Sequence, residues 1–267
     1  MNTADDALRT RYSFACDLAA AAGRRTLRSF RSPRVAVETK ADHTPVTRAD
    51  RETEAFLRER IAAAFPGDGI IGEEHGVTEG TGPYRWILDP IDGTRSFICG
   101  VPLYGTLIGL QRDGAGVAGV IEIPALGESV HACAGEGAWY CRRGRKPVRA
   151  RVSACAALGE AVFLTSDIDA FHTRGAGDAF QALARGCRVT RTWGDCYGYL
   201  LVATGRADLM IDPRMSVWDA AAVLPVVEEA GGRFTDWRGR ATVAAGEGVA
   251  CNEALLRQVL PLLGATV

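Results

Sequence analysis

Apolar residues recur with a helical period at the start of the chain and then with the period of a strand. Residues 3–30 carry apolar side chains on one helical face, which predicts an amphipathic helix that ends near Ser32-Pro33. Residues 34–39 alternate as a short strand does. The polar stretch from Lys40 to Thr47 is predicted to be a loop.

A second helix is predicted from about Ala49 to Phe65. Thr47 and Asp50 have the spacing of a capping box in front of it, and Pro66-Gly67 ends it. Strand-like runs separated by glycine and proline then dominate. They cover residues 69–72, 85–88, 104–111, 117–123 and 129–132.

The pattern changes near residue 150, where we place a soft boundary. The segment before it, from Cys141 to Arg151, is basic and rich in turn residues, which predicts a solvated hairpin or linker. A patch for a phosphate backbone is the alternative, although no aromatic residues interleave the charges. Predicted strands and helices alternate after the boundary. The strands are 161–166, 188–192, 207–211, 233–235 and 248–251, and the helices are 178–185, 197–204, 217–230 and 253–263.

These patterns predict an α/β fold class in two parts. Residues 1–150 should form an α+β half and residues 151–267 an α/β half, because strands alternate with helices only in the second part. Pro225 lies inside the predicted helix 217–230 and should kink it.

Composition and charge exclude several classes of protein. Apolar residues make up 47% of the chain and charged residues 24%, as in ordinary globular proteins, so a disordered or disulfide-stapled chain is excluded. The formal net charge of −1 gives no global electrostatic case for binding nucleic acid or an anionic membrane. There is no apolar run long enough to predict a membrane span, and the N-terminal segment lacks the features of a signal peptide.

The eight cysteines are widely scattered and form no CxxC pair. This pattern favours reduced, mostly buried thiols in a cytoplasmic protein. It argues against a cysteine zinc site, which needs closer pairs.

Acidic residues gather beside three apolar segments. Glu73 and Glu74 follow one predicted strand, Asp89 and Asp92 follow the next, and Asp219 stands in a third apolar stretch. Like charges that are brought together need a cation or a shared proton. Hard divalent cations prefer oxygen ligands, and Mg²⁺ commonly takes a few carboxylates together with water and a substrate phosphate.

The hexapeptide from Asp89 to Thr94 combines several groups that suit phosphate chemistry. Pro90 fixes the turn, Gly93 allows a close approach of the backbone, and Thr94 can start a short helix whose free N–H groups face an anion. Hydrolysis of a phosphate monoester is so slow without catalysis that a single general base, worth about 10²–10⁴-fold, is insufficient. Metal ions supply the missing stabilisation, so the residues indicate metal-assisted phosphate ester hydrolysis.

These motifs resemble the inositol monophosphatase family of Mg²⁺-dependent phosphatases. The matching segments are Gly72–Glu74, Asp89–Thr94, Trp218–Ala221 leading into Glu229–Gly232, and Lys40 with Pro45–Asp50. Their order and spacing agree over roughly residues 5–260. The resemblance implies a layered αβαβα sandwich of the inositol monophosphatase and fructose-1,6-bisphosphatase type. It also implies a homodimer that acts on a small-molecule phosphate monoester.

The resemblance further implies two to three Mg²⁺ ions per site. Glu73, Asp89 and the carbonyl of Ile91 would hold the first ion. Asp89, Asp92 and Asp219 would hold the second ion.

Other roles come from the same resemblance. Glu73 and Asp50 would serve a looser third ion, partly through water. Asp50 and Thr94 would orient the attacking water, with Glu73 nearby, and the N–H groups of Gly93 and Thr94 would bind the phosphate.

Within the family, the chain is most similar to the histidinol-phosphate phosphatases of histidine biosynthesis. The segments that carry this likeness are Lys40–Thr47 and Trp193–Tyr199. Histidinol phosphate carries an ammonium and an imidazole, so its pocket should present carboxylates, and Asp195 and Asp212 are the candidates. Lys40 is also expected near the substrate. Two alternatives stay open, because Asp195 can be the N-cap of the helix at 197–204 and Asp212 stands where the family has a sugar-contacting acid.

Three functional hypotheses follow. The first is a Mg²⁺-dependent phosphatase that converts L-histidinol phosphate to L-histidinol and phosphate. The second is the same chemistry on inositol 1-phosphate, fructose 1,6-bisphosphate or a 3′-phosphoadenosine nucleotide. The third is a non-catalytic dimer that binds metal or phosphate. The sequence argues against it, because every expected metal-ligand position carries a suitable residue.

Overall fold

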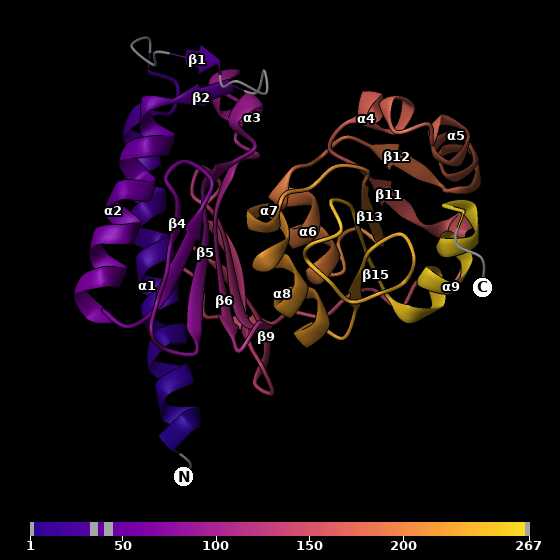
Figure 1. Cartoon of the computed structure of the whole chain (residues 1–267). Coiled ribbons are helices and arrows are strands. Elements are labelled where there is room, and N and C mark those ends of the chain that lie inside the picture. Colours follow the sequence, from indigo (N-terminus) through magenta and orange to yellow (C-terminus); the bar gives the residue numbers. More distant parts are fainter. Residues whose placement is uncertain (1–2, 33–36, 40–44, 265–267) are drawn as a thin grey trace.

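The computed structural model describes residues 3–32, 37–39 and 45–264 (Figure 1). Lys40, one of the residues expected near the substrate, lies outside the described residues. The short strands β1 (Val37–Thr39) and β2 (Pro45–Thr47) pair antiparallel. The expectation of a loop up to Thr47 is therefore wrong for its last three residues, which form β2 by pairing with β1.

Two long helices begin the first half. They are α1 (Thr3–Ser29) and α2 (Arg48–Ala64), close to the predicted bounds. The predicted capping box is confirmed, because the side chain of Thr47 accepts a hydrogen bond from the N–H of Ala49 and Asp50 accepts one from the N–H of Thr47.

These helices cover one face of an eight-stranded sheet with the order β10-β9-β8-β7-β6-β5-β3-β4 (Figure 1). Neighbouring strands are antiparallel except for β3 and β5, which are parallel. The bounds are β3 (Gly69–Gly72), β4 (Gly76–Thr78), β5 (Tyr84–Asp92), β6 (Gly105–Arg112), β7 (Ala115–Ile123), β8 (Glu128–Cys133), β9 (Gly137–Arg142) and β10 (Val148–Arg149). The basic segment before residue 150 contains the end of β9, the turn and β10, which pairs antiparallel with β9, so the predicted hairpin is confirmed.

The second half is built on a five-stranded sheet with the order β12-β11-β13-β15-β14. β11 is parallel to β12 and β13, whereas β15 is antiparallel to both of its neighbours. The strands are β11 (Val162–Leu164), β12 (Val189–Arg191), β13 (Leu209–Asp212), β14 (Arg233–Thr235) and β15 (Gly248–Cys251). The helices after β5 are α3 (Thr94–Ile98), α4 (Ile168–Thr173), α5 (Gly177–Gly186), α6 (Cys196–Ala203), α7 (Val217–Ala221), α8 (Val223–Glu229) and α9 (Glu253–Leu262).

Figure 1 shows the elements stacked in five layers. α1 and α2 form the first layer, the eight-stranded sheet the second, α6 to α8 the third, the five-stranded sheet the fourth, and α4, α5 and α9 the fifth. Three apolar clusters fill the spaces between them, and the largest joins both sheets through the middle helices. This is the αβαβα sandwich that the sequence motifs imply.

Two glycines let the middle helices approach the large sheet closely. Gly109 on β6 and Gly119 on β7 are cross-strand partners. A methyl group at Gly109 would lie 2.7 Å from the backbone of Ala221, and one at Gly119 would lie 2.1 Å from the carbonyl oxygen of Ala222. Only glycine at both positions allows the junction of α7 and α8 to rest on the strands.

The helix predicted over residues 217–230 is divided. α7 ends at Ala221 and α8 begins at Val223. Pro225 has no N–H to donate to the carbonyl of Ala221, four residues earlier, so the helix is interrupted at Ala222, whose backbone stays helical at φ −79° and ψ −33°.

The cysteines were expected to be mostly buried, and the structure agrees only in part. All eight cysteines lie within the described residues and are free thiols. Cys133, Cys196 and Cys251 are buried, whereas Cys99 is exposed. Among the helices that the structure describes, none combines the length and apolar composition needed to cross a bilayer.

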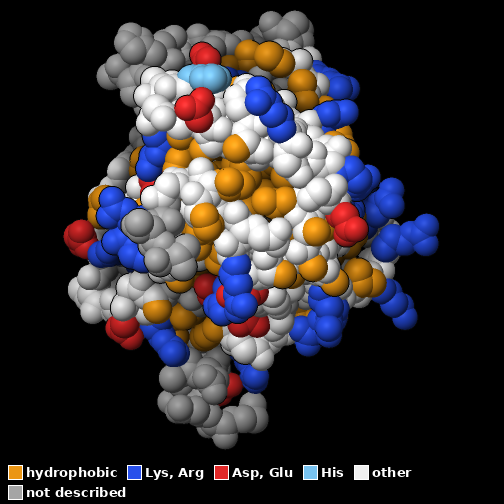
Figure 2. Space-filling model, turned by 90° about the vertical axis from the view of Figure 1, so that its right-hand side faces the viewer, with side chains coloured by type: hydrophobic (Ala, Val, Ile, Leu, Met, Phe, Trp, Pro, Cys, Tyr) orange, Lys and Arg blue, Asp and Glu red, His pale blue; other side chains and the backbone are white. Residues whose placement is uncertain are grey.

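Figure 2 shows the outer face of the second half, where apolar side chains form separate patches between polar and charged atoms. The third apolar cluster lies beneath this layer and includes Phe163, Phe171 and Trp237. The outer helices are therefore amphipathic and turn their apolar sides inward.

Candidate active site

Strand register brings the first two carboxylates together. Gly72 at the end of β3 pairs with Leu88 on the parallel strand β5. Glu73 and Asp89 are the next residues of these two strands, and the N–H of Glu73 donates to the carbonyl of Leu88. Carboxyl ends of adjacent parallel strands meet at one sheet edge, so both side chains line the same cleft.

The end of β5 departs from regular strand geometry. The register of β5 with β6 shifts between Asp89 and Asp92. Asp89 Oδ1 accepts a hydrogen bond of 3.0 Å from the N–H of Ile91, and the carbonyl of Pro90 accepts one of 2.9 Å from the hydroxyl of Thr106. This irregularity turns both Asp89 and Asp92 toward the cleft.

One hydrogen bond joins the site to the second half, and a local one holds Asp219 within that half. Asp92 Oδ2 accepts a hydrogen bond of 2.5 Å from the N–H of Cys196, the first residue of α6. Asp219 lies in the first turn of α7, where its carboxylate accepts a hydrogen bond of 2.6 Å from the N–H of Ser216. Oxygens of Asp89, Asp92 and Asp219 all lie within 4.8 Å of one another.

This grouping changes the protonation of the carboxylates. Burial and the charge of Glu73 raise the pKa of Asp89 well above its usual range. Burial and the charge of Asp195 do the same to the pKa of Asp92. Burial raises the pKa of Asp219 to about 7. A divalent cation would relieve this repulsion, and an all-oxygen donor set fits a hard ion such as Mg²⁺.

Asp50 and Thr94 form a pair beside the carboxylates. The hydroxyl of Thr94 lies 3.3 Å from Asp50 Oδ1 and 3.1 Å from the carbonyl oxygen of Ile91. Asp50 is fully buried, and burial raises its pKa. Thr94 and Gly93 line the cleft, with Gly93 in the left-handed region at φ 82°.

Glu54 is a positioning residue that the sequence patterns did not reveal. It is fully buried on α2, and its carboxylate accepts hydrogen bonds from the N–H groups of Glu74 (2.6 Å) and His75 (3.1 Å). Arg58 donates to the same carboxylate at 2.7 Å. A methyl group at Gly72 would lie 2.0 Å from Glu54 Oε1. Glu54 therefore fixes the turn that carries Glu73, and its one signal in the sequence is its place one helical turn after Asp50.

The three predicted substrate residues have different surroundings. Asp195 lines the cleft and stands at the N-cap of α6, but its side chain makes no capping hydrogen bond. Asp212 also lines the cleft, although it is only 4% exposed and accepts hydrogen bonds from Ser166 and Tyr199. Lys40 lies outside the described residues.

The cleft has a volume of about 520 Å³, and most of its charged lining residues are acidic. Of the described residues that line it, seven carry carboxylates and two, Arg95 and Arg214, carry guanidinium groups. Arg95 lies 3.6 Å from Asp167. The carboxylates belong to Glu73, Asp89, Asp92, Asp167, Asp195, Asp212 and Asp219.

The sequence model of the inositol monophosphatase family matches residues 7–265. The chain belongs to the inositol monophosphatase family. It is 44% identical to a histidinol-phosphatase of Chlorobaculum parvum over 94% of this chain and 95% of that protein. It is 41% identical to a histidinol-phosphatase of Mycobacterium tuberculosis over 86% of this chain and 88% of that protein.

Solved structures support the same membership. An inositol monophosphatase of Zymomonas mobilis superposes with a TM-score of 0.83 at 33% identity, over 99% of this chain and all of that chain. The fold and the family expected from the motifs are thus confirmed, and the chain is a phosphatase of this family. The homodimer, the cytoplasmic location and the individual residue roles stay predictions.

Proposed function

We propose that this phosphatase is Mg²⁺-dependent and hydrolyses L-histidinol phosphate to L-histidinol and phosphate. The observation that carries the metal dependence is the convergence of Asp89, Asp92 and Asp219 oxygens within 4.8 Å. Three carboxylates at this separation are stable as anions only when a cation lies between them. The names of the relatives at 44% and 41% identity and the charge of the cleft support the substrate.

In this proposal each metal ligand keeps the role that the motifs suggest. Glu73, Asp89 and the carbonyl of Ile91 hold one ion, and Asp89, Asp92 and Asp219 hold a second. When bound, the ions supply polarisation of the phosphoryl group, a more acidic water and stabilisation of the leaving oxygen. The main-chain N–H groups of Gly93 and Thr94, at the first turn of α3, bind the phosphate.

Thr94 and Asp50 orient the water that attacks phosphorus. The hydroxyl of Thr94 shares its single proton between Asp50 and the carbonyl of Ile91, so its lone pairs stay available to accept a hydrogen bond from a water in the cleft. A water held there donates to Thr94 and presents its own lone pair to the phosphate. Burial raises the pKa of Asp50, so its carboxylate is a stronger proton acceptor than an exposed aspartate. Its complete burial favours this role over that of a ligand to a looser third ion.

The charge of the cleft favours a substrate that carries a cation. Two divalent ions and a phosphate dianion together leave the lining negative, because seven of the described lining residues are acidic and only two are basic. Asp195 is the carboxylate best suited to meet an ammonium or imidazolium group, since it lies in the cleft and its side chain makes no capping hydrogen bond at the start of α6. The carboxylate oxygens of Asp212 already accept hydrogen bonds from Ser166 and Tyr199. We therefore assign Asp212 a structural role in the wall of the cleft.

Phosphate release from a panel of substrates tests this function. The panel contains L-histidinol phosphate, inositol 1-phosphate, fructose 1,6-bisphosphate and a 3′-phosphoadenosine nucleotide, each with and without Mg²⁺. We expect the highest kcat/KM on histidinol phosphate and no turnover without Mg²⁺. A preference for an uncharged polyol phosphate would contradict the substrate, and Mg²⁺ binding without any phosphate release would favour the non-catalytic dimer.

Asp195→Asn sharpens the substrate test. A charged hydrogen bond contributes about 1.5–3 kcal/mol, so kcat/KM for histidinol phosphate should fall about tenfold or more. Activity on inositol 1-phosphate should not fall. Asp178→Asn is the matched control, because Asp178 is exposed on α5 and does not line the cleft. Equal losses on both substrates in the Asp195 variant would remove the argument for cation recognition.

A further inference from the structure

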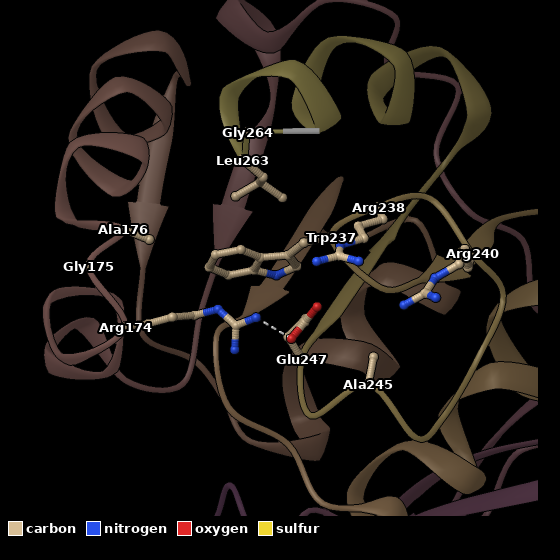
Figure 3. A pocket seen from close by; sticks show the side chains of 10 residues that line it. All are labelled: Arg174, Gly175, Ala176, Trp237, Arg238, Arg240, Ala245, Glu247, Leu263 and Gly264. Carbon is tan, nitrogen blue, oxygen red and sulfur yellow. Dashed lines mark hydrogen bonds and ion pairs between the residues drawn. The ribbon is translucent and has the colours of Figure 1, made fainter. Parts of the chain in front are cut away.

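A second cavity of about 520 Å³ lies on the outer side of the five-stranded sheet (Figure 3). Its walls come from the turn between α4 and α5, the segment from Trp237 to Glu247, and the end of α9. It shares no lining residue with the acidic cleft. Three of its described lining residues are arginines, Arg174, Arg238 and Arg240, and one is acidic, Glu247.

The positive charges of the three arginines differ in whether a nearby carboxylate balances them. Arg174 forms an ion pair with Glu247, which is only 9% exposed. Arg240 Nε donates to the buried carboxylate of Asp236 at 2.7 Å, which leaves its two terminal nitrogens without an acceptor among the described residues. The guanidinium of Arg238 has no hydrogen-bond or ion-pair partner within the part of the chain that the structure describes. With the carboxylates of Glu247 and Asp236 both counted, the three arginines therefore keep one positive charge in surplus.

Trp237 provides a second, independent sign of a missing ligand. Its side chain is only 6% exposed, and its indole nitrogen has no hydrogen-bond partner among the described residues. The ring stacks on Phe171 at 5.6 Å and lies 4.7 Å from the guanidinium carbon of Arg174. Figure 3 shows the nitrogen-bearing edge of the indole on the side where Arg238 and Glu247 lie. A buried donor without an acceptor costs about 1–3 kcal/mol, so an acceptor from a ligand would stabilise this arrangement.

We propose that this cavity binds the oxyanion of a small metabolite, a carboxylate or a phosphate, separately from the active site. The guanidinium groups of Arg238 and Arg240 would donate paired hydrogen bonds to it, since their planar geometry matches both groups. The indole N–H of Trp237 would supply a further donor. Glu247 does not cancel this attraction, because Arg174 already compensates its charge.

Hydrogen bonds connect the walls of the cavity to the cleft. Arg174 Nη1 donates to the carbonyl of Pro213 at 3.0 Å, and the N–H of Met215 donates to the carbonyl of Gly246 at 2.8 Å. Pro213 and Met215 line the acidic cleft. An anion bound by Arg238 and Arg240 beside these walls would therefore act on the segment that precedes the predicted metal ligand Asp219.

Nuclear magnetic resonance of the tryptophan indole groups tests the site without any substrate. The full chain, freed of divalent ions over a chelating resin, is titrated with inorganic pyrophosphate and, separately, with malonate. Trp237→Phe assigns the resonance of Trp237 among the five tryptophans of the chain. We expect a saturable shift of that resonance, and we expect the double variant Arg238→Gln with Arg240→Gln to weaken binding at least about tenfold.

The control variant is Arg185→Gln, because Arg185 is exposed on α5 and does not line the cavity. A response to pyrophosphate alone identifies a phosphate ligand, and a response to malonate alone identifies a carboxylate. No saturable shift with either anion, or equal shifts in the double variant, would overturn the proposal. The other indole resonances report whether each variant is folded.

The connection to the cleft has its own measurement, which rests on the proposed function. Phosphate release with Mg²⁺ is followed at increasing malonate, and we expect the KM to change in the wild type but not in the double variant. An unchanged KM despite binding would overturn the connection. Failure of the proposed function would leave the binding measurement intact, because that measurement uses neither substrate nor metal.

Discussion

The first half of the chain places its carboxylates through strand register, whereas the second half places its carboxylate through the docking of a helix. Glu73 and Asp89 directly follow Gly72 and Leu88, which are paired on the parallel strands β3 and β5. The sheet itself therefore sets the separation of the two acidic residues. Asp219 is carried by the short helix α7, which reaches the sheet only because Gly109 and Gly119 leave room for it. The predicted metal site therefore depends on packing between the halves as well as on the acidic residues themselves.

The largest effect should come from the carboxylate shared by both predicted metal positions. Asp89→Asn removes a charge that both ions need, and we expect kcat to fall at least about 10³-fold, since metal ions contribute several kcal/mol to such reactions. The purified variant should retain its circular dichroism spectrum, because the amide keeps the volume of the carboxylate. Near-normal phosphate release at saturating Mg²⁺ would contradict the shared role.

The docking of the second half can be broken without touching an acidic residue. Gly119→Ala adds a methyl group 2.1 Å from the carbonyl oxygen of Ala222, so α7 and α8 must move. We expect the free energy of unfolding to fall by about 1–3 kcal/mol, the usual cost of overpacking, and Mg²⁺ binding measured by calorimetry to weaken. Gly116→Ala on the same strand is the control, because its nearest contact would be an ordinary 3.6 Å. Unchanged Mg²⁺ affinity in the Gly119 variant would mean that docking does not position Asp219.

In the first half, a substitution of Glu54 tests whether the strand register of β3 and β5 alone is enough to position Glu73. Glu54→Gln removes the charge that Arg58 and the N–H groups of Glu74 and His75 share. We expect Mg²⁺ affinity to fall about tenfold, since hydrogen bonds to charged groups contribute about 1.5–3 kcal/mol and the turn that carries Glu73 loosens. Glu59→Gln on the exposed side of α2 should change nothing. If both variants bind Mg²⁺ equally well, β3 and β5 position Glu73 without help.

The smallest effect is a dependence of stability on pH and metal. Burial raises the pKa of Asp219 to about 7 and raises the pKa of Asp89. An acid whose pKa is higher in the folded than in the unfolded chain stabilises the fold below about pH 4, and this contribution is lost as the pH rises toward 7. Mg²⁺ replaces the proton, so it should raise the Tm more at pH 8 than at pH 6, by about 2–4 °C for each kcal/mol. Equal shifts at both values in differential scanning fluorimetry would contradict the raised pKa values.

The sequence predicted the parts of the site that depend on short stretches of chain. The hexapeptide from Asp89 to Thr94 carries its turn, its carboxylates and its helix start within six residues, so local patterns suffice. The capping box of Thr47 and Asp50 is local in the same sense. The helices of the middle layer were also predictable, including the interruption near Pro225.

Other features depend on contacts between distant segments and leave no local pattern. Glu54 resembles any helical glutamate until the turn after β3 folds onto it. Gly109 and Gly119 resemble weak points in strands until α7 and α8 rest on them. The cavity around Trp237 combines residues from α4, the segment after β14 and the end of α9, which only the complete fold brings together.

Crystals grown with Mn²⁺, a divalent ion of similar ligand preference that scatters anomalously, test the central claim most directly. The anomalous difference map should contain its strongest peaks between the carboxylates of Asp89, Asp92 and Asp219 and beside Glu73. Those peaks should disappear in Asp89→Asn crystals of the same form. A map without density among these carboxylates at saturating Mn²⁺, or with its peaks elsewhere on the chain, would contradict the metal site on which the proposed phosphatase chemistry rests.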